Sequence, residues 1–549
     1  MTNPEGGAWL DNIEPATGQV FSRIPRSNAA DVEAAVQAAR TAFPAWSATP
    51  FEERAACLRR WGALIAEHSE ALIAAESQDN GKPVSLARAV DIPRAQKNLE
   101  FFAGAIEHFA SEAHIPGGAE FIHYTHRKPI GVVGCISPWN LPLYLFTWKI
   151  APALAAGNCV VAKPSEVTPV TAWMLSKWAA EAGFPAGVFN VVHGLGHEAG
   201  QALVEHPHVK AISFTGGTQT GAHITRTTAG MFKKLSLELG GKNPAIVFAD
   251  CDFDKAVSTT IRSSFANQGQ ICLCSSRILI EDSLYDAFRD ALVAKAKRIA
   301  PGDPSDPNTK MGALVSAPHR DKVLAYIESA KDQGASVLCG GNTAAAPNDR
   351  CETGYFVQPT ILEGLGPGCS INQEEIFGPL ITLQRFSTEA EAVKLANDSD
   401  YGLAATIWTQ DAAKAHRVAT QVESGIAWIN CWLVRDLRTP FGGVKSSGYG
   451  REGGSESPAI AQHPGEDQEH GQGGQDEPKG ALGVIGDPLG VLPLHPHPDH
   501  GEQRGQGQRD EERRESVVED LNFRHEEDHE GAQEQLGAVH PCQAHHFLP

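Results

Sequence analysis

Residues 132–163, VVGCISPWNLPLYLFTWKIAPALAAGNCVVAK, decide the fold class of this chain. A β-rich run at 132–136 precedes a helix-like segment near 143–156, and a second β-rich run follows at 159–162. A strand, a helix and a strand in this order predict two parallel strands joined by a right-handed crossover.

The same alternation continues along the chain. Further β-rich runs and the helix-like segments between them lie at 169–182, 188–192, 197–205, 211–214, 219–228 and 234–237. A second alternating block contains 245–248, 277–280, 285–298, 380–386, 405–409 and 425–430. We therefore expect two doubly wound α/β domains, which bind ligands at the carboxyl ends of their strands.

The region before these blocks has a helical pattern. Apolar residues recur with helical spacing over 31–43, where Pro44 is expected to end the helix, and the pattern resumes over 52–75.

Composition excludes several classes of protein. The 549 residues are 42% hydrophobic and 20% charged, which is typical of a globular chain. The best candidate for a membrane span, 150–162, is interrupted by Pro152, Gly157 and Asn158, and the N-terminus lacks the pattern of a secretory signal. Eleven cysteines without a CxxC pair favour a reducing, cytoplasmic location over a disulfide scaffold, and we expect no metal site.

Charge is concentrated at the C-terminal end. The net charge is -20, and residues 455–549 contain 20 acidic and 6 basic residues together with 10 of the 22 histidines. Because few apolar residues recur there, we expect a disordered tail. The chain has no basic stripe, so nucleic acid is not an expected partner.

Three side chains have the chemistry of acyl transfer. Cys272 ends the segment FANQGQIC (265–272) near an expected helix start, and backbone N–H groups at a helix N-terminus lower the pKa of a thiol. Glu238 ends an expected strand and can act as a general base, while Asn140 can direct its amide at an oxyanion. Taken alone, each has an ordinary alternative: a buried cysteine, a solvated glutamate and a turn asparagine. Cys274 also competes with Cys272 for the role of nucleophile.

The segment FTGGTQTG (214–221) lies between an expected strand and an expected helix. Gly216 allows a tight turn, and the helix N-terminus after it can face a phosphate, although the segment is not a GxGxxG motif. Lys163 and Glu166 lie at the end of the second strand, where they can hold ribose hydroxyls. Glu166 would repel a 2′-phosphate, which favours NAD over NADP.

Together these segments resemble the aldehyde dehydrogenase superfamily. Residues 265–277 match the family pattern FxNxGQxCxxxxR, and Glu238, 34 residues before Cys272, matches the glutamate of the LELGGK signature. Further family motifs follow in the expected order: Trp139-Asn140, KPSE (163–166), EIFGP (375–379) and PFGG (440–443). The resemblance covers residues 8–454.

The resemblance implies a mechanism. The Cys272 thiolate would attack an aldehyde, and the Asn140 amide and the Cys272 backbone N–H would hold the oxyanion. Hydride transfer would leave a thioester, which Glu238 would hydrolyse by activating water, with Lys149 in a supporting role. The implied NAD-binding residues are Ile136, Ser137, Pro138, Trp139, Lys163, Ser165, Glu166, Phe214, Thr215, Gly216, Gly217, Leu239, Glu375 and Phe377.

The resemblance also implies a domain plan: a Rossmann-like NAD-binding domain (1–111 and 130–239), an oligomerisation hairpin (112–129), a catalytic thiol domain (240–440) and a return segment (441–454). The family continues after this point with an aromatic-containing strand that pairs across subunits. Residues 455–549 contain no such sequence, and the abrupt change in composition is typical of a reading-frame switch in the gene. We therefore expect the family's homo-oligomer to be weakened.

The substrate is expected from the segment NCWLVRDLR (430–438), which resembles the branch acting on 2-aminomuconic and 2-hydroxymuconic semialdehydes. Arg94 aligns with a position in the family's substrate tunnel, and Arg94 and Arg435 are expected to bind the distal carboxylate. The alternatives are a betaine-aldehyde-like or general aliphatic specificity, a non-catalytic protein that retains the fold, and a thiol hydrolase that pairs Cys272 with a histidine.

Overall fold

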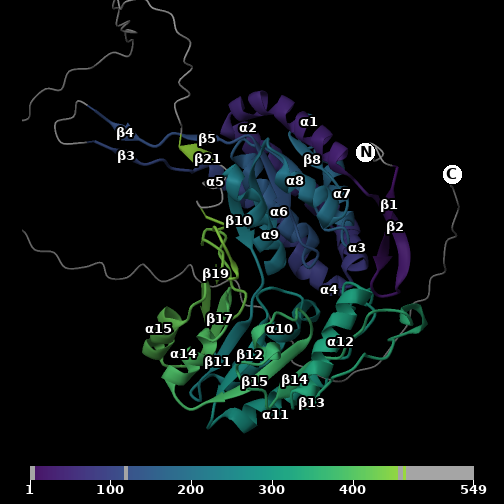
Figure 1. Cartoon of the computed structure of the whole chain (residues 1–549), viewed down its shortest axis with the longest axis vertical. Coiled ribbons are helices and arrows are strands. Elements are labelled where there is room, and N and C mark those ends of the chain that lie inside the picture. The colour runs from purple at the N-terminus through teal and green to yellow at the C-terminus, as the bar shows by residue number, and fades with distance from the viewer. Residues whose placement is uncertain (1–6, 116–120, 455–461, 465–549) are drawn as a thin grey trace, which may run out of the picture. The chain divides into compact units, whose positions relative to one another are not determined.

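Six strands form the sheet predicted from the first alternating block (Figure 1). The computed structural model describes residues 7–115 and 121–454 and the backbone of 462–464, all within the unit Met1–Glu469. In spatial order the strands are β20 (Gly448–Tyr449), β10 (Lys234–Glu238), β9 (Val209–Thr215), β6 (Val132–Ile136), β7 (Cys159–Lys163) and β8 (Phe189–Val191). All neighbours are parallel except β10 and β20. The order reverses between β6 and β9, which is where a doubly wound sheet binds its ligand.

Helices connect and cover these strands. Those that join the strands are α6 (Pro142–Ala155), α7 (Val170–Lys177), α8 (Gln201–Glu205) and α9 (Thr218–Thr228), with π-helix η2 (Gly196–Gly200) and 3-10 helix η3 (Ala229–Met231). The N-terminal helices are α1 (Ala29–Ala48), α2 (Phe51–Glu67), α3 (Ser69–Asn80), α4 (Val84–Leu86), π-helix η1 (Ala87–Asp91) and α5 (Ile92–Glu107).

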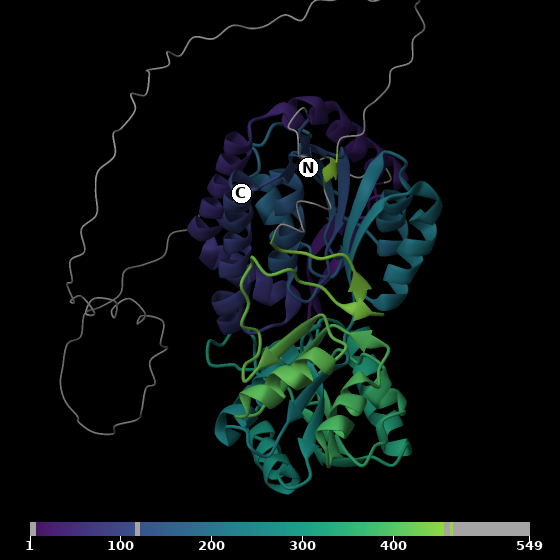
Figure 2. The same cartoon turned by 90° about the vertical axis from the view of Figure 1, so that its left-hand side faces the viewer.

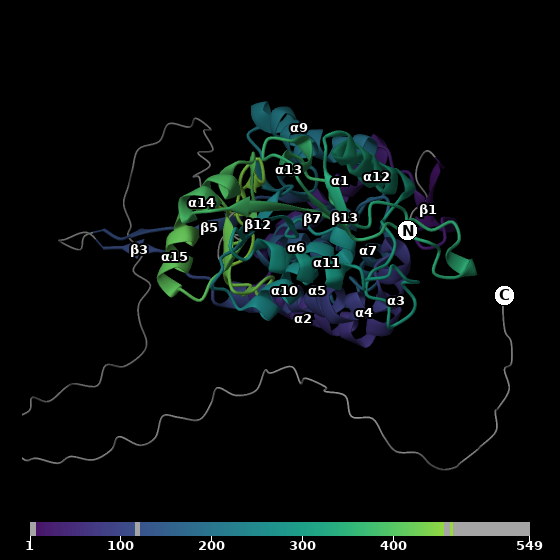
Figure 3. The same cartoon turned by 90° about the horizontal axis from the view of Figure 1, so that it is seen from below.

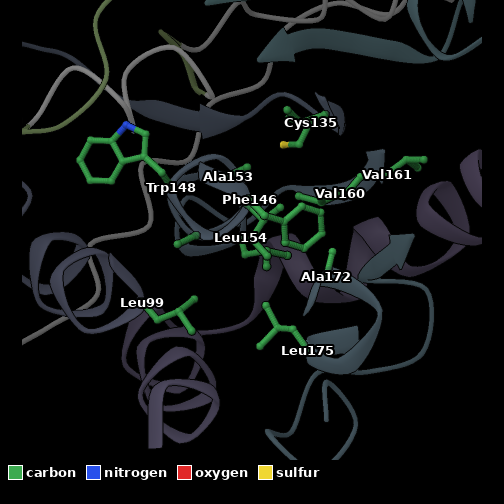
Figure 4. Packing of buried hydrophobic residues seen from close by; sticks show 14 of the residues in the cluster. Leu99, Cys135, Phe146, Trp148, Ala153, Leu154, Val160, Val161, Ala172 and Leu175 are labelled. Atoms are coloured by element: carbon green, nitrogen blue, oxygen red, sulfur yellow. The ribbon is translucent and has the colours of Figure 1, made fainter. Parts of the chain in front are cut away.

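The core of this half forms where α5, α6 and α7 meet β7 (Figure 4). Leu99, Leu154, Val160 and Leu175 are fully buried there, and Phe146 is almost fully buried. Strand β7 is buried along its whole length, which explains why its sequence is continuously apolar up to Lys163.

The second sheet contains seven strands. In spatial order they are β13 (Ser336–Cys339), β14 (Thr360–Glu363), β15 (Leu380–Phe386), β12 (Ser275–Glu281), β11 (Asn243–Val247), β17 (Ala404–Trp408) and β18 (Ile426–Ile429). Only the edge strand β13 runs antiparallel to its neighbour. The remaining elements are α10 (Phe253–Phe265), α11 (Tyr285–Ala296), α12 (Ala317–Asp332), α13 (Ser370–Gln373), α14 (Glu389–Asn397), α15 (Ala412–Gln421) and the 3-10 helices η4 (Ala266–Gly269) and η5 (Asp349–Cys351).

Helices lie on both faces of this sheet, with α10 and α11 on one face and α14 and α15 on the other (Figure 3). Ala245 and Val247 belong to the cluster that includes residues of α10 and α11, whereas Ile246 belongs to the cluster that includes residues of α14 and α15. Because successive side chains of a strand point to opposite faces, helices cover both sides of the sheet. The predicted fold class, two parallel-dominant α/β sheets covered by helices, is confirmed.

Short strands connect the parts of this unit. β19 (Val444–Lys445) pairs with β16 (Tyr401–Gly402), and β20 then joins the edge of the first sheet (Figure 2). The other pairs are β1 (Trp9–Glu14) with β2 (Gln19–Pro25), β3 (Ala113–His114) with β4 (His123–Tyr124), and β5 (Arg127–Pro129) with β21 (Gln462–Pro464). β21 lies in the region expected to be a disordered tail; the rest of 455–549 lies outside the described residues.

One expectation for the N-terminal region was wrong. Helix α1 continues through Pro44 to Ala48, because Trp46 is buried and its ring packs 5.6 Å from the ring of Phe184. This packing compensates for the backbone hydrogen bond that proline cannot donate. The helical pattern predicted over 52–75 is confirmed, as two helices: α2 ends at Glu67 and α3 begins at Ser69. The hairpin of β1 and β2 was not predicted.

No helix within residues 7–115 and 121–454 is both long and apolar enough to cross a membrane. The ten cysteines of these ranges are all free thiols.

Replacing Leu99 by alanine removes a fully buried side chain from the core of α5, α6 and α7. We expect the free energy of unfolding to fall by about 2–5 kcal/mol, measured as a lower urea midpoint of the transition that reports this half. Val20→Ala, at a side chain 50% exposed, is the control and should change stability by less than about 0.5 kcal/mol. Equal shifts in the two variants would contradict this assignment of the core.

Candidate active site

A cavity of about 250 Å³ lies at the carboxyl ends of the first sheet's central strands. Loops that follow β6, β9 and β10 form one side of it, and segments of the second half form the other. Ten of its residues were predicted as site residues: Pro138, Trp139, Asn140, Thr215, Gly216, Gly217, Leu239, Cys272, Glu375 and Phe377. Three were not: Gly240, His319 and Lys322.

The loop that carries Cys272 has an unusual backbone. Asn267 and Gln268 have positive φ angles of 51° and 58°, and Gly269 follows at 72°. A Cβ at Gly269 would lie only 2.2 Å from the carbonyl oxygen of Gly378, so this position requires glycine. Cys272 lies in a turn directly before β12, and no helix begins there.

The expectation of a lowered thiol pKa is therefore wrong. Cys272 is partly exposed to the cavity, but the protein atoms around it desolvate the sulfur. This burial raises the pKa of the Cys272 thiol, and the negative charges of Glu375 and Glu238 raise it further. In the protein without ligands Cys272 is consequently a neutral thiol at pH 7.

Buried carboxamides hold the Cys272 loop and the Asn140 loop together. Asn140 donates from Nδ2 to the carbonyl of Gln270 at 3.0 Å, and Asn267 donates from Nδ2 to the carbonyl of Asn140 at 2.9 Å. Asn243 donates from its own Nδ2 to the carbonyl of Cys272 at 2.6 Å. The Asn140 amide keeps a second N–H beyond the one given to Gln270.

Glu238 is the last residue of β10 and is buried beside a second group of charges. Its Oε1 has no hydrogen-bond partner among the described residues. Burial raises its pKa well above the ordinary value, and the nearby carboxylate of Glu452 adds to the effect. Lys149 donates from Nζ to Glu452 at 2.9 Å, so the two form a buried ion pair close to Glu238. Glu452 was not predicted as a site residue, although it lies in the predicted return segment, 441–454.

The glycine segment forms an open turn at the N-terminus of α9. A Cβ at Gly216 would lie 2.4 Å from the ring of Phe214, whereas a Cβ at Gly217 would meet no atom within 4 Å. Gly217 is the N-cap residue, so free N–H groups of the first helical turn point toward this turn. The geometry suits a phosphate group.

Other predicted cofactor residues lie around this turn, at or beside the strand ends, but do not line the cavity. Lys163, buried at the end of β7, contacts Glu166 at 3.0 Å, and the N–H of Ser137 donates to the Lys163 carbonyl at 3.2 Å. The residues in this position are Ile136, Ser137, Lys163, Ser165, Glu166 and Phe214.

Helix α12 supports the cavity from the second half. The Nε2 of His319 lies 2.7 Å from the carbonyl oxygen of Phe377, and its ring packs 5.1 Å from that of Trp139. Burial lowers the pKa of His319 to about 4, so the ring is neutral and its N–H can donate to that carbonyl. Phe377 itself has a positive φ of 64°. No sequence motif marks His319 or Lys322, and only the fold brings α12 to the cavity.

The two predicted substrate arginines are half-buried and close together. Arg94 and Arg435 each have guanidinium N–H groups without an acceptor, and no carboxylate among the described residues pairs with either. Their side chains lie against Trp148, with the guanidinium carbons 5.8 Å and 4.4 Å from its ring centre. The positive charge of Arg435 acts on the pKa values of both Cys272 and Glu238, so Arg435 lies near the thiol, although neither arginine lines the cavity.

Comparisons with known proteins agree with this site. A family model described as the aldehyde dehydrogenase family matches residues 2–460. The chain is 51% identical over 449 residues to the 2-aminomuconic semialdehyde dehydrogenase of Danio rerio (82% of this chain, 92% of the relative). It is 49% identical over 456 residues to the 2-hydroxymuconic semialdehyde dehydrogenase of Pseudomonas sp. strain CF600 (82% and 94%). A crystal structure of betaine aldehyde dehydrogenase from Staphylococcus aureus in complex with NAD+ has a TM-score of 0.81 at 38% identity (84% and 91%).

The raised pKa of Cys272 predicts an unusual pH dependence of alkylation. In ligand-free protein the rate of modification by iodoacetamide, followed on the Cys272 peptide by mass spectrometry, should rise about tenfold per pH unit and show no plateau up to pH 10. Free cysteine, measured as the control, should level off above about pH 8.5. A plateau for Cys272 below pH 8 would show that the thiolate is stabilised instead.

Proposed function

Because the chain belongs to the aldehyde dehydrogenase family, we propose that it oxidises a semialdehyde that carries a carboxylate, such as 2-aminomuconic or 2-hydroxymuconic semialdehyde, to the dicarboxylic acid. The chain is an NAD-dependent oxidoreductase, and NAD is its cofactor. The observation that carries the proposed substrate class is the pair of half-buried arginines, Arg94 and Arg435, whose guanidinium groups have no carboxylate partner among the described residues. Arg435 lies near Cys272.

The residues of the cavity fit a dinucleotide. The turn at Gly216 and Gly217 leaves room for a phosphate at the N-terminus of α9, and Glu375 and Phe377 lie across the cavity from it. The strand-end residues Lys163 and Glu166 would hold a ribose. When bound, NAD supplies the acceptor for the hydride that leaves the aldehyde carbon.

Cys272 would form a bond from Sγ to the aldehyde carbon, and the thiol proton, which burial keeps on the sulfur, would pass to Glu238 and from there to water. The free N–H of Asn140 and the backbone N–H of Cys272 would hold the resulting oxyanion. After the hydride has left, Glu238 would accept a proton from the water that hydrolyses the thioester, which releases the acid and restores the thiol. The Lys149–Glu452 pair lies beside Glu238 and would tune its charge.

The same arginines argue against a betaine-aldehyde-like specificity. A quaternary ammonium group next to Arg94 and Arg435 would be repelled, and the two guanidinium groups would remain unpaired. A dicarboxylate product or its semialdehyde instead supplies the missing anion, and guanidinium suits bidentate pairing with a carboxylate.

We propose that a second copy of the chain binds to the hairpin formed by β3 and β4. Figure 1 shows these strands extending away from the helices, and Tyr124 on β4 and Ile115, Phe121 and Ile122 next to the two strands are exposed. Exposed apolar side chains on a projecting hairpin are typical of a subunit contact. The proposal also includes the domain plan implied by the family resemblance, a weakened homo-oligomer and a cytoplasmic location.

The activity is tested by NADH formation at 340 nm with a panel of semialdehydes and neutral aldehydes. Cys272→Ala should lower kcat by more than about 10⁴-fold, because no other group can form the thioester. Cys274→Ala is the matched control, since this buried thiol lies two residues away and should be dispensable. If the Cys274 variant, and not the Cys272 variant, loses activity, the nucleophile is misassigned.

Arg94→Ala and Arg435→Ala test the substrate class. Each should raise KM for a carboxylate-bearing semialdehyde about 10–100-fold, because each removes a charge-assisted hydrogen bond, while KM for a neutral aldehyde of similar length should change less than about threefold. The comparison is made by initial rates at saturating NAD. Equal effects on charged and neutral substrates would overturn the carboxylate assignment.

A further inference from the structure

Three ionisable side chains are buried directly behind the Asn140 loop. Lys82 follows α3, Glu76 lies within α3 and Asp91 ends the π-helix η1, and all three are fully inaccessible to solvent. Lys82 contacts Asp91 at 2.6 Å and Glu76 at 3.7 Å. None of them lines the cavity, and nothing in the proposed reaction uses them.

The Lys82 ammonium reaches the backbone of the proposed oxyanion residue. Its Nζ donates to the carbonyl oxygen of Asn140 at 3.1 Å, the same oxygen that accepts from Asn267. Asn80, two residues earlier, donates from Nδ2 to the carbonyl of Trp139 at 2.8 Å. The end of α3 thus holds two consecutive carbonyls of the loop.

Glu76 holds the other side of the loop. Its Oε1 accepts from the N–H of Leu143 at 3.3 Å, in the first turn of α6, and its Oε2 accepts from the hydroxyl of Thr171 at 2.7 Å. The backbone on both sides of Asn140 is therefore bonded to one buried cluster. A buried ion pair is no more stable than an apolar replacement of the same volume, so stability alone does not explain these charges. Lys82 donates a hydrogen bond to the backbone carbonyl of Asn140, which an apolar side chain in its place could not do.

We propose that Lys82 is a positioning residue, which Asp91 holds in place so that its ammonium orients the Asn140 peptide and, through it, the amide that faces the oxyanion. This inference rests on the proposed function and adds to it residues that do not touch substrate or cofactor. Positioning matters because a displacement of about 1 Å in such a site can cost about 100-fold in rate.

The test is a double-mutant cycle between this cluster and Asn140. The double variant Lys82→Met/Asp91→Leu removes both charges of the ion pair, so neither charge stays buried without a partner. Glu76 remains protonated, because burial raises the pKa of this carboxyl to about 8. We expect kcat to fall about 100-fold, with KM for NAD and the alkylation rate of Cys272 changed less than about threefold, since alkylation forms no oxyanion. In an Asn140→Ala background the same pair of changes should lower kcat less than about threefold. Equal losses in both backgrounds would overturn the inference.

Asp91→Asn is the second variant, because it keeps the shape of the site and lets Lys82 pair with Glu76. It should lower kcat about tenfold, again only when Asn140 is present. Asp79→Asn is the matched control: Asp79 is an equally buried carboxyl on α3 that contacts Asn12 and Val170, and its variant should keep full activity. A loss in the control as large as that in Asp91→Asn would mean that any buried carboxyl of α3 has this effect, against the proposal.

Amide hydrogen exchange separates this inference from the proposed function. Exchange in residues 139–145 should increase in Lys82→Met/Asp91→Leu and in Asp91→Asn but not in Asp79→Asn, whether or not an aldehyde is oxidised. Unchanged exchange there would overturn the positioning role. Absence of NADH formation by the unaltered protein, with the exchange pattern as expected, would instead count against the proposed function alone.

Discussion

Two hydrogen bonds between Asn140 and the loop before β12 connect the two halves of the site. Asn140 gives its amide N–H to Gln270 and receives the amide N–H of Asn267 at its carbonyl. Asn140 follows β6, a central strand of the first sheet, whereas Asn267 and Gln270 precede β12, a central strand of the second. Because an unpaired buried amide costs free energy, these bonds keep the thiol and the proposed oxyanion donor at a constant separation. The cavity depends on this connection.

Desolvation dominates the chemistry of the site. The same burial raises the pKa values of Cys272, Glu238 and Glu375, and it leaves Arg94 and Arg435 without anionic partners. The thiol and the Glu238 carboxyl are therefore neutral in the ligand-free protein, whereas the two guanidinium groups stay positively charged without an anionic partner among the described residues. Such groups interact strongly with a ligand that brings the missing charge, which gives the substrate proposal its physical basis.

The sequence predicted the sheets well, because buried parallel strands are continuously apolar and are separated by helices of regular length. The range 132–136 coincides with β6 and 380–386 with β15. Predictions failed where contacts distant in sequence decide the outcome. The packing of Trp46 carries α1 past Pro44, and the turn at Cys272 replaces the expected helix because Asn267 and Gln268 adopt positive φ angles.

The sequence by itself determined the α/β class and the strand ends, and it singled out the side chains that are proposed to react, since periodicity and motif spacing are local properties. Only the tertiary structure decided which of these residues share a cavity and what their ionisation states are. It brought His319 and Lys322 to the cavity, placed Glu452 beside Lys149 and put Lys82 behind Asn140. These are contacts between residues far apart in the chain, and the pKa of a group depends on everything that surrounds it in space.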